Sequence, residues 1–162
     1  MKLTDEMIKI CEIQASYFSS SIEDFTCGSR LFTFRFMNSK LAKLLDNPDY
    51  MSLYTPTNYK ELLIKEYPGL NQKYGYKVDE PIMHWIGYIY RAISLLLHIS
   101  SKHLLKKLPF ADMVFLYKVH HTYGVEYCVN RINQEYQLVQ TNSSKEKEIA
   151  KKVYKDLIMS LK

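Results

Sequence analysis

Residues 79–99 read DEPIMHWIGYIYRAISLLLHI, and this stretch decides the expected fold. Asp79 and Glu80 precede Pro81, a pattern typical of the start of a helix. Beyond Pro81 the apolar residues recur at spacings of three and four, which places them on one wide helical face. They are Ile82, Trp85, Ile86, Ile89, Ala92, Ile93, Leu96 and Leu97. We therefore predict that this stretch forms the central core helix.

The same stretch approaches the length of a bilayer span, but its polar residues argue against insertion into a membrane. Arg91 lies at its middle, and His84 and His98 lie near its ends. A central arginine costs about 2.5–3.5 kcal/mol on insertion scales. The sequence therefore favours a buried helix of a soluble protein. The chain also starts with an acidic, amphipathic pattern, so we expect no secretion signal and a cytoplasmic location.

The composition predicts an all-α fold. The chain has 162 residues, of which 47% are hydrophobic and 24% are charged, as in ordinary globular proteins. It contains 5 Gly and 5 Pro, too few for the many turns of sandwiches, barrels or βα units. We expect a single compact bundle of about six to eight helices with a helix-turn-helix-like core. Residues 1–140 form this domain, and residues 141–162 form a peripheral or partner-binding helix.

In the first third of the chain, local signals mark two helices. Thr4 is expected to cap a first helix, which the serines at 19–21 interrupt. Residues 32–36 alternate in hydrophobicity, which suits a strand. The leucines that follow them favour a helix instead, and we predict a helix from residue 29 to residue 45.

Further along the chain, turn residues predict the remaining boundaries. Thr55 and Pro56 open a helix that ends before Pro68. Gly124 is expected to end another helix in a left-handed conformation. Ser143 forms a capping box with the glutamate three residues later, which predicts the start of the last helix.

A helix-turn-helix motif is predicted directly after the core helix. Serines end the core helix and cap a short helix at 102–107. In a nucleic-acid-binding regulator, which is our alternative hypothesis for function, this motif would contact phosphates or base edges. The contacting residues would be Ser100, Ser101, Lys102, Lys106 and Lys107. The charge distribution agrees with binding to a polyanion. Residues 81–162 hold 12 basic and 6 acidic groups, whereas residues 1–80 hold 10 basic and 11 acidic groups.

The sequence holds no motif for catalysis or metal binding. The glycines are isolated, and the histidines form neither HExxH nor a pair four residues apart on one helix. The three cysteines are far apart and form no CxxC pair, which indicates free thiols in a reducing compartment. We therefore expect no cofactor, no metal and no enzymatic activity. An active site built from residues distant in sequence is the weaker alternative.

Tyrosine is unusually frequent, with 14 residues. Several of these tyrosines crowd into one loop-rich stretch: Tyr50, Tyr54, Tyr59, Tyr67, Tyr74 and Tyr76. Tyrosine combines a large apolar body with a polar tip and is enriched at protein interfaces. A binding surface is one interpretation, and half-buried positions at the edge of the core explain the tyrosines equally well.

Several motifs resemble one protein family. Residues 85–91 read WIGYIYR, two serines follow at 100–101, and Tyr117 precedes His121-Thr122-x-Gly124. This pattern is similar to an antitoxin-like family of small bacterial proteins, often encoded beside ADP-ribosyltransferase-like toxins. The similarity covers mainly Trp85–Ile132, and Tyr123 departs from it where leucine is usual.

The resemblance implies a non-enzymatic protein-binding module that neutralises or regulates a neighbouring toxin or effector protein. The candidate partner-binding residues are Tyr88, Arg91, Tyr117, His121, Thr122, Tyr54 and Tyr59. The cognate partner would be a protein such as an ADP-ribosyltransferase-like toxin. DNA as a further ligand and self-association of the chain both remain open.

Overall fold

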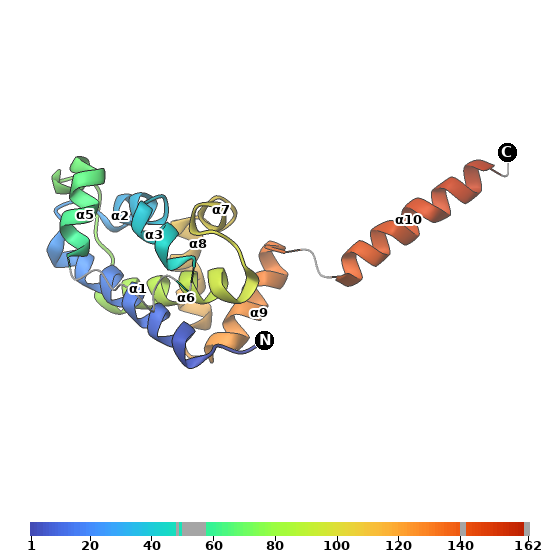
Figure 1. The fold of residues 1–162 in the computed structure, drawn as a ribbon, viewed down its shortest axis with the longest axis horizontal. Coiled ribbons are helices and arrows are strands. Elements are labelled where there is room, and N and C mark those ends of the chain that lie inside the picture. The colour runs from blue at the N-terminus through green and yellow to red at the C-terminus, as the bar shows by residue number, and fades with distance from the viewer. Residues whose placement is uncertain (48, 50–57, 140–141, 161–162) are drawn as a thin grey trace.

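Every regular element in the described part of the chain is helical. The computed structural model describes residues 1–47, 49, 58–139 and 142–160 (Figure 1). The α-helices are α1 (Asp5–Asp24), α2 (Ser29–Met37), α3 (Lys40–Leu45), α5 (Tyr59–Glu66), α6 (Glu80–Leu97), α7 (Ser101–Lys107), α8 (Phe110–His120), α9 (Val125–Tyr136) and α10 (Asn142–Ser160), and the 3-10 helix η1 covers Pro68–Asn71. The prediction of an all-α bundle is confirmed. The predicted start at Thr55 and Pro56 lies outside the described residues.

The predicted core helix is α6, which packs along α1 and also contacts α7, α8 and α9. Gly87 allows the close approach of α1, because a Cβ atom there would lie 2.7 Å from the Phe18 side chain. The Gln14 amide of α1 donates a hydrogen bond of 3.0 Å to the Gly87 carbonyl. None of the described helices is by itself long and apolar enough to cross a bilayer.

α1 begins where the sequence predicts but continues further. Thr4 is its N-cap, and the Thr4 hydroxyl accepts a hydrogen bond from the Met7 N–H. The predicted interruption at serines 19–21 is wrong, because α1 runs through them to Asp24. The hydroxyls of Ser19 and Ser21 donate to backbone carbonyls three residues earlier, which satisfies them within the helix.

Residues 29–45 are helical, as predicted, but they form two helices rather than one. The break lies at Asn38 and Ser39. The Ser39 hydroxyl accepts a hydrogen bond of 3.1 Å from the Ala42 N–H and so caps α3. The new direction of α3 brings Asp46, at its C-terminal end, to the interior side chain of Arg91.

α6 and α7 form the predicted helix-turn-helix-like core. The two helix axes differ by 109°, and residues 98–100 connect them. His98 turns the chain with a left-handed φ of 53°. The Ser100 hydroxyl then accepts a hydrogen bond from the His103 N–H and caps α7, as predicted.

Two predicted boundaries near the C-terminus are wrong. Gly124 has a φ of −64° and is the N-cap of α9, so it is not a left-handed end of α8. α8 already ends at His120, and the turn before Gly124 needs no positive φ. α10 begins at Asn142, so Ser143 lies inside the helix rather than at its cap. α10 extends away from the other helices (Figure 1).

Candidate functional site

Arg91, which the sequence assigns to partner binding, is fully buried and holds four helices together. Its guanidinium contacts the Asp46 carboxylate at 2.6 Å and donates to the Gln14 side chain at 2.7 and 2.9 Å. Burial lowers the pKa of Arg91, and the Asp46 carboxylate opposes that shift. The partner-binding prediction for Arg91 is therefore wrong, because the ion pair requires this arginine in the interior.

Ser101, assigned to nucleic-acid contact in the alternative hypothesis, belongs to the same buried network. Its hydroxyl donates to the Asp46 carboxylate at 2.6 Å and accepts from Arg91 at 2.9 Å. Its side chain is not available to DNA, so this part of the alternative is wrong. By contrast, the side chains of Ser100, Lys102, Lys106 and Lys107 are exposed.

The predicted tyrosines of the middle region divide into structural and exposed residues. Tyr59 is half-buried, stacks on Tyr17 with ring centroids 4.4 Å apart, and donates its hydroxyl proton to the Asp24 carboxylate. Burial and the Asp24 contact raise the pKa of Tyr59. These contacts join α5 to α1, so Tyr59 has a structural role. Tyr54 lies outside the described residues.

The remaining predicted partner residues lie on α6 and at the end of α8. Tyr88 is half-buried, and burial raises its pKa to about 12. Tyr117 packs edge-on against Trp85 at 5.7 Å and stacks on His121 at 4.5 Å. His121 and Thr122 are exposed. The structure thus places Tyr117, His121 and Thr122 together at the C-terminal end of α8.

Four exposed apolar side chains lie on α8, in the turn after it and on α9, and we call them the α8–α9 surface. Its members are Phe115 (63% exposed), Val119 (47%), Tyr123 (54%) and Tyr127 (50%). Phe115 and Val119 are four residues apart on α8, and the rings of Tyr123 and Tyr127 lie 5.0 Å apart. Contiguous exposed apolar side chains mark sites of protein association, and the surface offers two such pairs. The sequence alone does not single out Phe115 and Val119, since their exposure depends on which side of α8 faces the core.

A second exposed surface, the aromatic–basic groove, lies between α2, residues 72–78 and α7. One hollow of about 660 Å³ is lined by Phe34, Arg30, Tyr74 and Tyr76. An adjoining hollow of about 290 Å³ shares Arg30 and Phe34 and reaches Lys102 and Lys106 on α7. The groove thus combines two tyrosines of the Tyr-rich stretch with two lysines of the predicted helix-turn-helix.

Backbone contacts fix the loop that carries Tyr74 and Tyr76. The Gly28 N–H donates to the Tyr74 carbonyl at 2.6 Å, and the Ser29 N–H donates to the Tyr76 carbonyl at 3.0 Å. A Cβ atom at Gly28 would lie within 2.9 Å of three backbone atoms of residues 74–76. Gly75, with a φ of 78°, provides the left-handed turn between the tyrosines. Tyr74 and Tyr76 therefore belong to a loop whose backbone is hydrogen-bonded to the start of α2.

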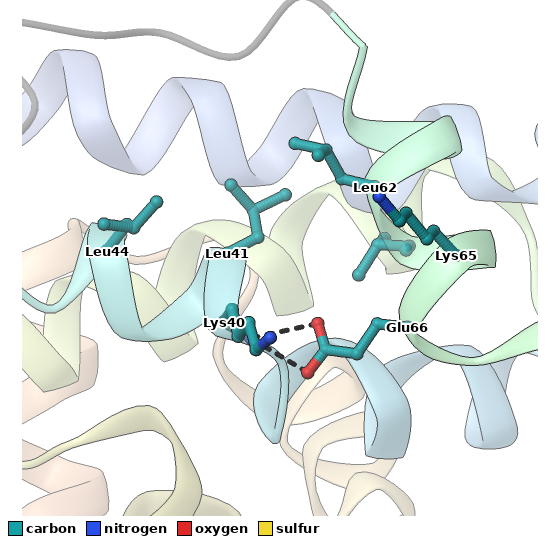
Figure 2. Close-up of a pocket in the computed structure, with 7 residues that line it drawn as sticks. Lys40, Leu41, Leu44, Leu62, Lys65 and Glu66 are labelled. Atoms are coloured by element: carbon teal, nitrogen blue, oxygen red, sulfur yellow. Dashed lines mark hydrogen bonds between the residues drawn. The ribbon is translucent and has the colours of Figure 1, made fainter.

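Another hollow, of about 390 Å³, lies between α3 and α5 (Figure 2). Leucines from both helices line it, and its only described acidic group is Glu66. The Glu66 carboxylate accepts hydrogen bonds of 3.2 Å from the backbone N–H of Lys40, at the start of α3. Glu66 thus satisfies a backbone N–H at the start of α3. This carboxylate has a structural role in the hollow rather than a reactive one.

The described thiols and imidazoles do not assemble a reactive centre. Cys11, Cys27 and Cys128 are buried, and burial raises the pKa of Cys11 to about 12. Among the described residues, no group of three or more His, Cys, Asp or Glu side chains is placed to hold a metal ion. His120 is buried, and its Nε2 lies 4.0 Å from a Glu135 oxygen.

Comparison with known proteins gives no relative: no protein-family model, curated protein or solved structure matches this chain. Function must therefore be inferred from the surfaces described above.

Proposed function

We propose that the chain is a non-enzymatic binding protein that blocks or regulates a partner protein, in the manner of the antitoxin-like family that Trp85–Ile132 resembles. The observation that carries the proposal is the α8–α9 surface. Four large apolar side chains are each about half exposed or more there. Tyr117 and His121, which belong to the pattern that carries the resemblance, stack on each other on another side of α8, because positions 117 and 121 are offset by two residues from 115 and 119. The partner is a protein encoded beside this one, and it is blocked by steric occlusion.

Steric occlusion of the partner needs only a complementary shape and apolar contact between the two proteins. Aromatic anchors dominate the energy of protein interfaces, and a few of them account for most of the affinity. Tyr123 and Tyr127 contact each other before any partner arrives, so little side-chain freedom is lost on binding. α10 offers a second apolar face with exposed Ile149, Val153 and Tyr154, and we assign it to the same partner.

Co-expression with the product of the adjacent gene tests this proposal. The wild-type chain should co-purify with that protein as a stable complex. Phe115→Ala combined with Tyr123→Ala should weaken the complex by about 30-fold for each ring removed, since hot-spot aromatics contribute about 2 kcal/mol or more each. Tyr74→Ala, which also removes an exposed ring, is the matched control and should leave the complex intact. If the doubly substituted chain binds as tightly as wild type, the proposal fails.

Deletion of residues 141–162 tests the role of α10 separately. The truncated chain keeps the whole helical body, because the described core residues end at Leu138. We expect it to bind the partner more weakly while its thermal unfolding midpoint stays unchanged. An unchanged affinity would remove α10 from the proposed interface and leave the α8–α9 surface as the binding site.

The duplex-binding alternative has less support. The 109° angle of α6 and α7 fits a helix-turn-helix, and three lysines of α7 are exposed. However, α7 has 7 residues, and Ser101 is committed to the Arg91 network. A recognition helix presents several side chains to base edges in the major groove. We therefore do not extend the proposal to duplex DNA.

A further inference from the structure

We propose that the aromatic–basic groove is a binding site for single-stranded nucleic acid. This site is separate from the α8–α9 surface and goes beyond the protein-binding function proposed above. The groove combines exposed aromatic rings with cationic side chains on neighbouring elements. Proteins that bind single strands combine these same two features, because bases stack on the rings while phosphates meet the cations.

The cations come from two helices that face the same groove. Arg30 precedes Phe34 by four residues on α2, and Lys102 precedes Lys106 by four residues on α7, so each pair lies on one helical face. The two hollows that these residues line share Arg30 and Phe34 and therefore adjoin at these two side chains. None of the described residues that line them is acidic. The charge of the groove thus favours a polyanion.

The rings supply the contact that distinguishes a single strand from other polyanions. Tyr74 is 73% exposed, Tyr76 is 74% exposed and Phe34 is 50% exposed. In the described structure neither tyrosine ring packs on another aromatic ring. Their faces are free for a base to stack on. In a duplex the bases already stack on one another, so the rings would gain nothing from it.

The backbone of the loop argues against an acidic peptide as the ligand. An extended peptide gains affinity mainly by pairing its backbone with free backbone groups of the protein. The carbonyls of Tyr74 and Tyr76 already accept hydrogen bonds from Gly28 and Ser29. The Asn38 amide at the groove wall likewise donates to the Phe34 carbonyl at 2.8 Å. The groove therefore offers ring faces and flexible cations, which suit a sugar–phosphate chain with unstacked bases.

Fluorescence anisotropy with a labelled oligothymidylate of about 12 nucleotides tests the proposal on the full chain. We expect saturable binding that weakens as the salt concentration rises from about 50 to 200 mM. An equally long duplex and a polyglutamate peptide of similar charge serve as competitors. Both should compete poorly. Competition by the duplex as strong as by the unlabelled single strand would overturn the proposal, and so would equal competition by polyglutamate.

Substitutions locate the binding. Tyr74→Ala and Tyr76→Ala should each weaken oligonucleotide binding by about tenfold, whereas Tyr74→Phe, which keeps the ring, should not. Tyr127→Ala is the matched control, because it removes an exposed ring of the α8–α9 surface and should have no effect. If Lys102→Ala weakens binding but neither tyrosine substitution does, the binding is electrostatic only and the stacking site is refuted.

The outcomes are independent of the protein-binding proposal. A chain with Tyr74→Ala and Tyr76→Ala should lose the oligonucleotide but retain the protein partner. A chain with Phe115→Ala and Tyr123→Ala should lose the protein partner but retain the oligonucleotide. Circular dichroism spectra of both variants should match wild type, since all four side chains are exposed.

Discussion

Arginine and tyrosine occur together at two places in this molecule, with opposite roles. In the interior, Arg91 and Tyr90 lie side by side on α6, and both are fully buried. In the groove, Arg30 and Tyr74 are exposed, Tyr74 at 73%. Every donor group of the interior pair has a partner, whereas the groove residues present theirs to solvent. The same residue types therefore stabilise the fold in one region and are free to bind in the other.

The largest difference in the free energy of unfolding is expected between substitutions of Arg91 and Arg30. Arg91→Ala should lower the free energy of unfolding by about 3–5 kcal/mol, because it leaves the Asp46 carboxylate without its cation and opens a cavity. Arg30→Ala should change it by less than about 0.5 kcal/mol. Urea denaturation of both variants measures the difference. Equal losses in the two variants would show that burial does not separate the roles of these arginines.

Substitution of Gly28, which contacts the loop of the groove, should have an intermediate effect on stability. Gly28→Ala places a Cβ atom 2.7 Å from the Tyr76 carbonyl oxygen, so the loop must move. We expect a loss of stability of about 1–3 kcal/mol, together with weaker oligonucleotide binding. Gly69→Ala is the control, since a Cβ atom there meets nothing within 4 Å. If Gly28→Ala retains wild-type stability and binding, the close contact between residue 28 and the loop is not what holds the groove.

The smallest difference in stability is expected between substitutions of Tyr90 and Tyr74. The buried Tyr90 hydroxyl donates a hydrogen bond of 2.7 Å to the Leu108 carbonyl. Tyr90→Phe removes that bond and should cost about 1 kcal/mol in thermal or urea unfolding. Tyr74→Phe should leave stability unchanged, because its hydroxyl faces solvent. A larger loss for Tyr74→Phe than for Tyr90→Phe would contradict the assignment of one tyrosine to the interior and the other to the groove.

Helices with strong periodicity and clear end signals could be predicted from the sequence. The wide apolar face of α6 and the caps at Thr4 and Ser100 are local features, and the structure confirms all three. The serines at 19–21 and Gly124 misled the prediction, because their residue types suit several conformations. Serine hydroxyls can bond within a helix, and glycine also serves as an N-cap.

The binding surfaces were only partly predictable, for a physical reason. Whether an arginine binds a partner or the core depends on residues distant in sequence. Asp46 lies 45 positions before Arg91, and no local pattern links them. Likewise, the groove forms only when residues 72–78 dock on the start of α2. The sequence singled out Tyr74, Lys102 and Lys106 in separate arguments, but their meeting is a property of the tertiary fold.

The packing of α1 on α6 has a consequence for the synthesis of the chain. Gln14 and Gly87, which touch at the crossing of the two helices, are 73 residues apart. A ribosome therefore releases α1 long before the helix that covers it has been made. Until Leu97 emerges, the apolar side chains of α1, Ile10 and Phe18 among them, have no α6 to pack against. In that interval the nascent chain exposes apolar surface that favours aggregation, and a chaperone that binds apolar helices would act then.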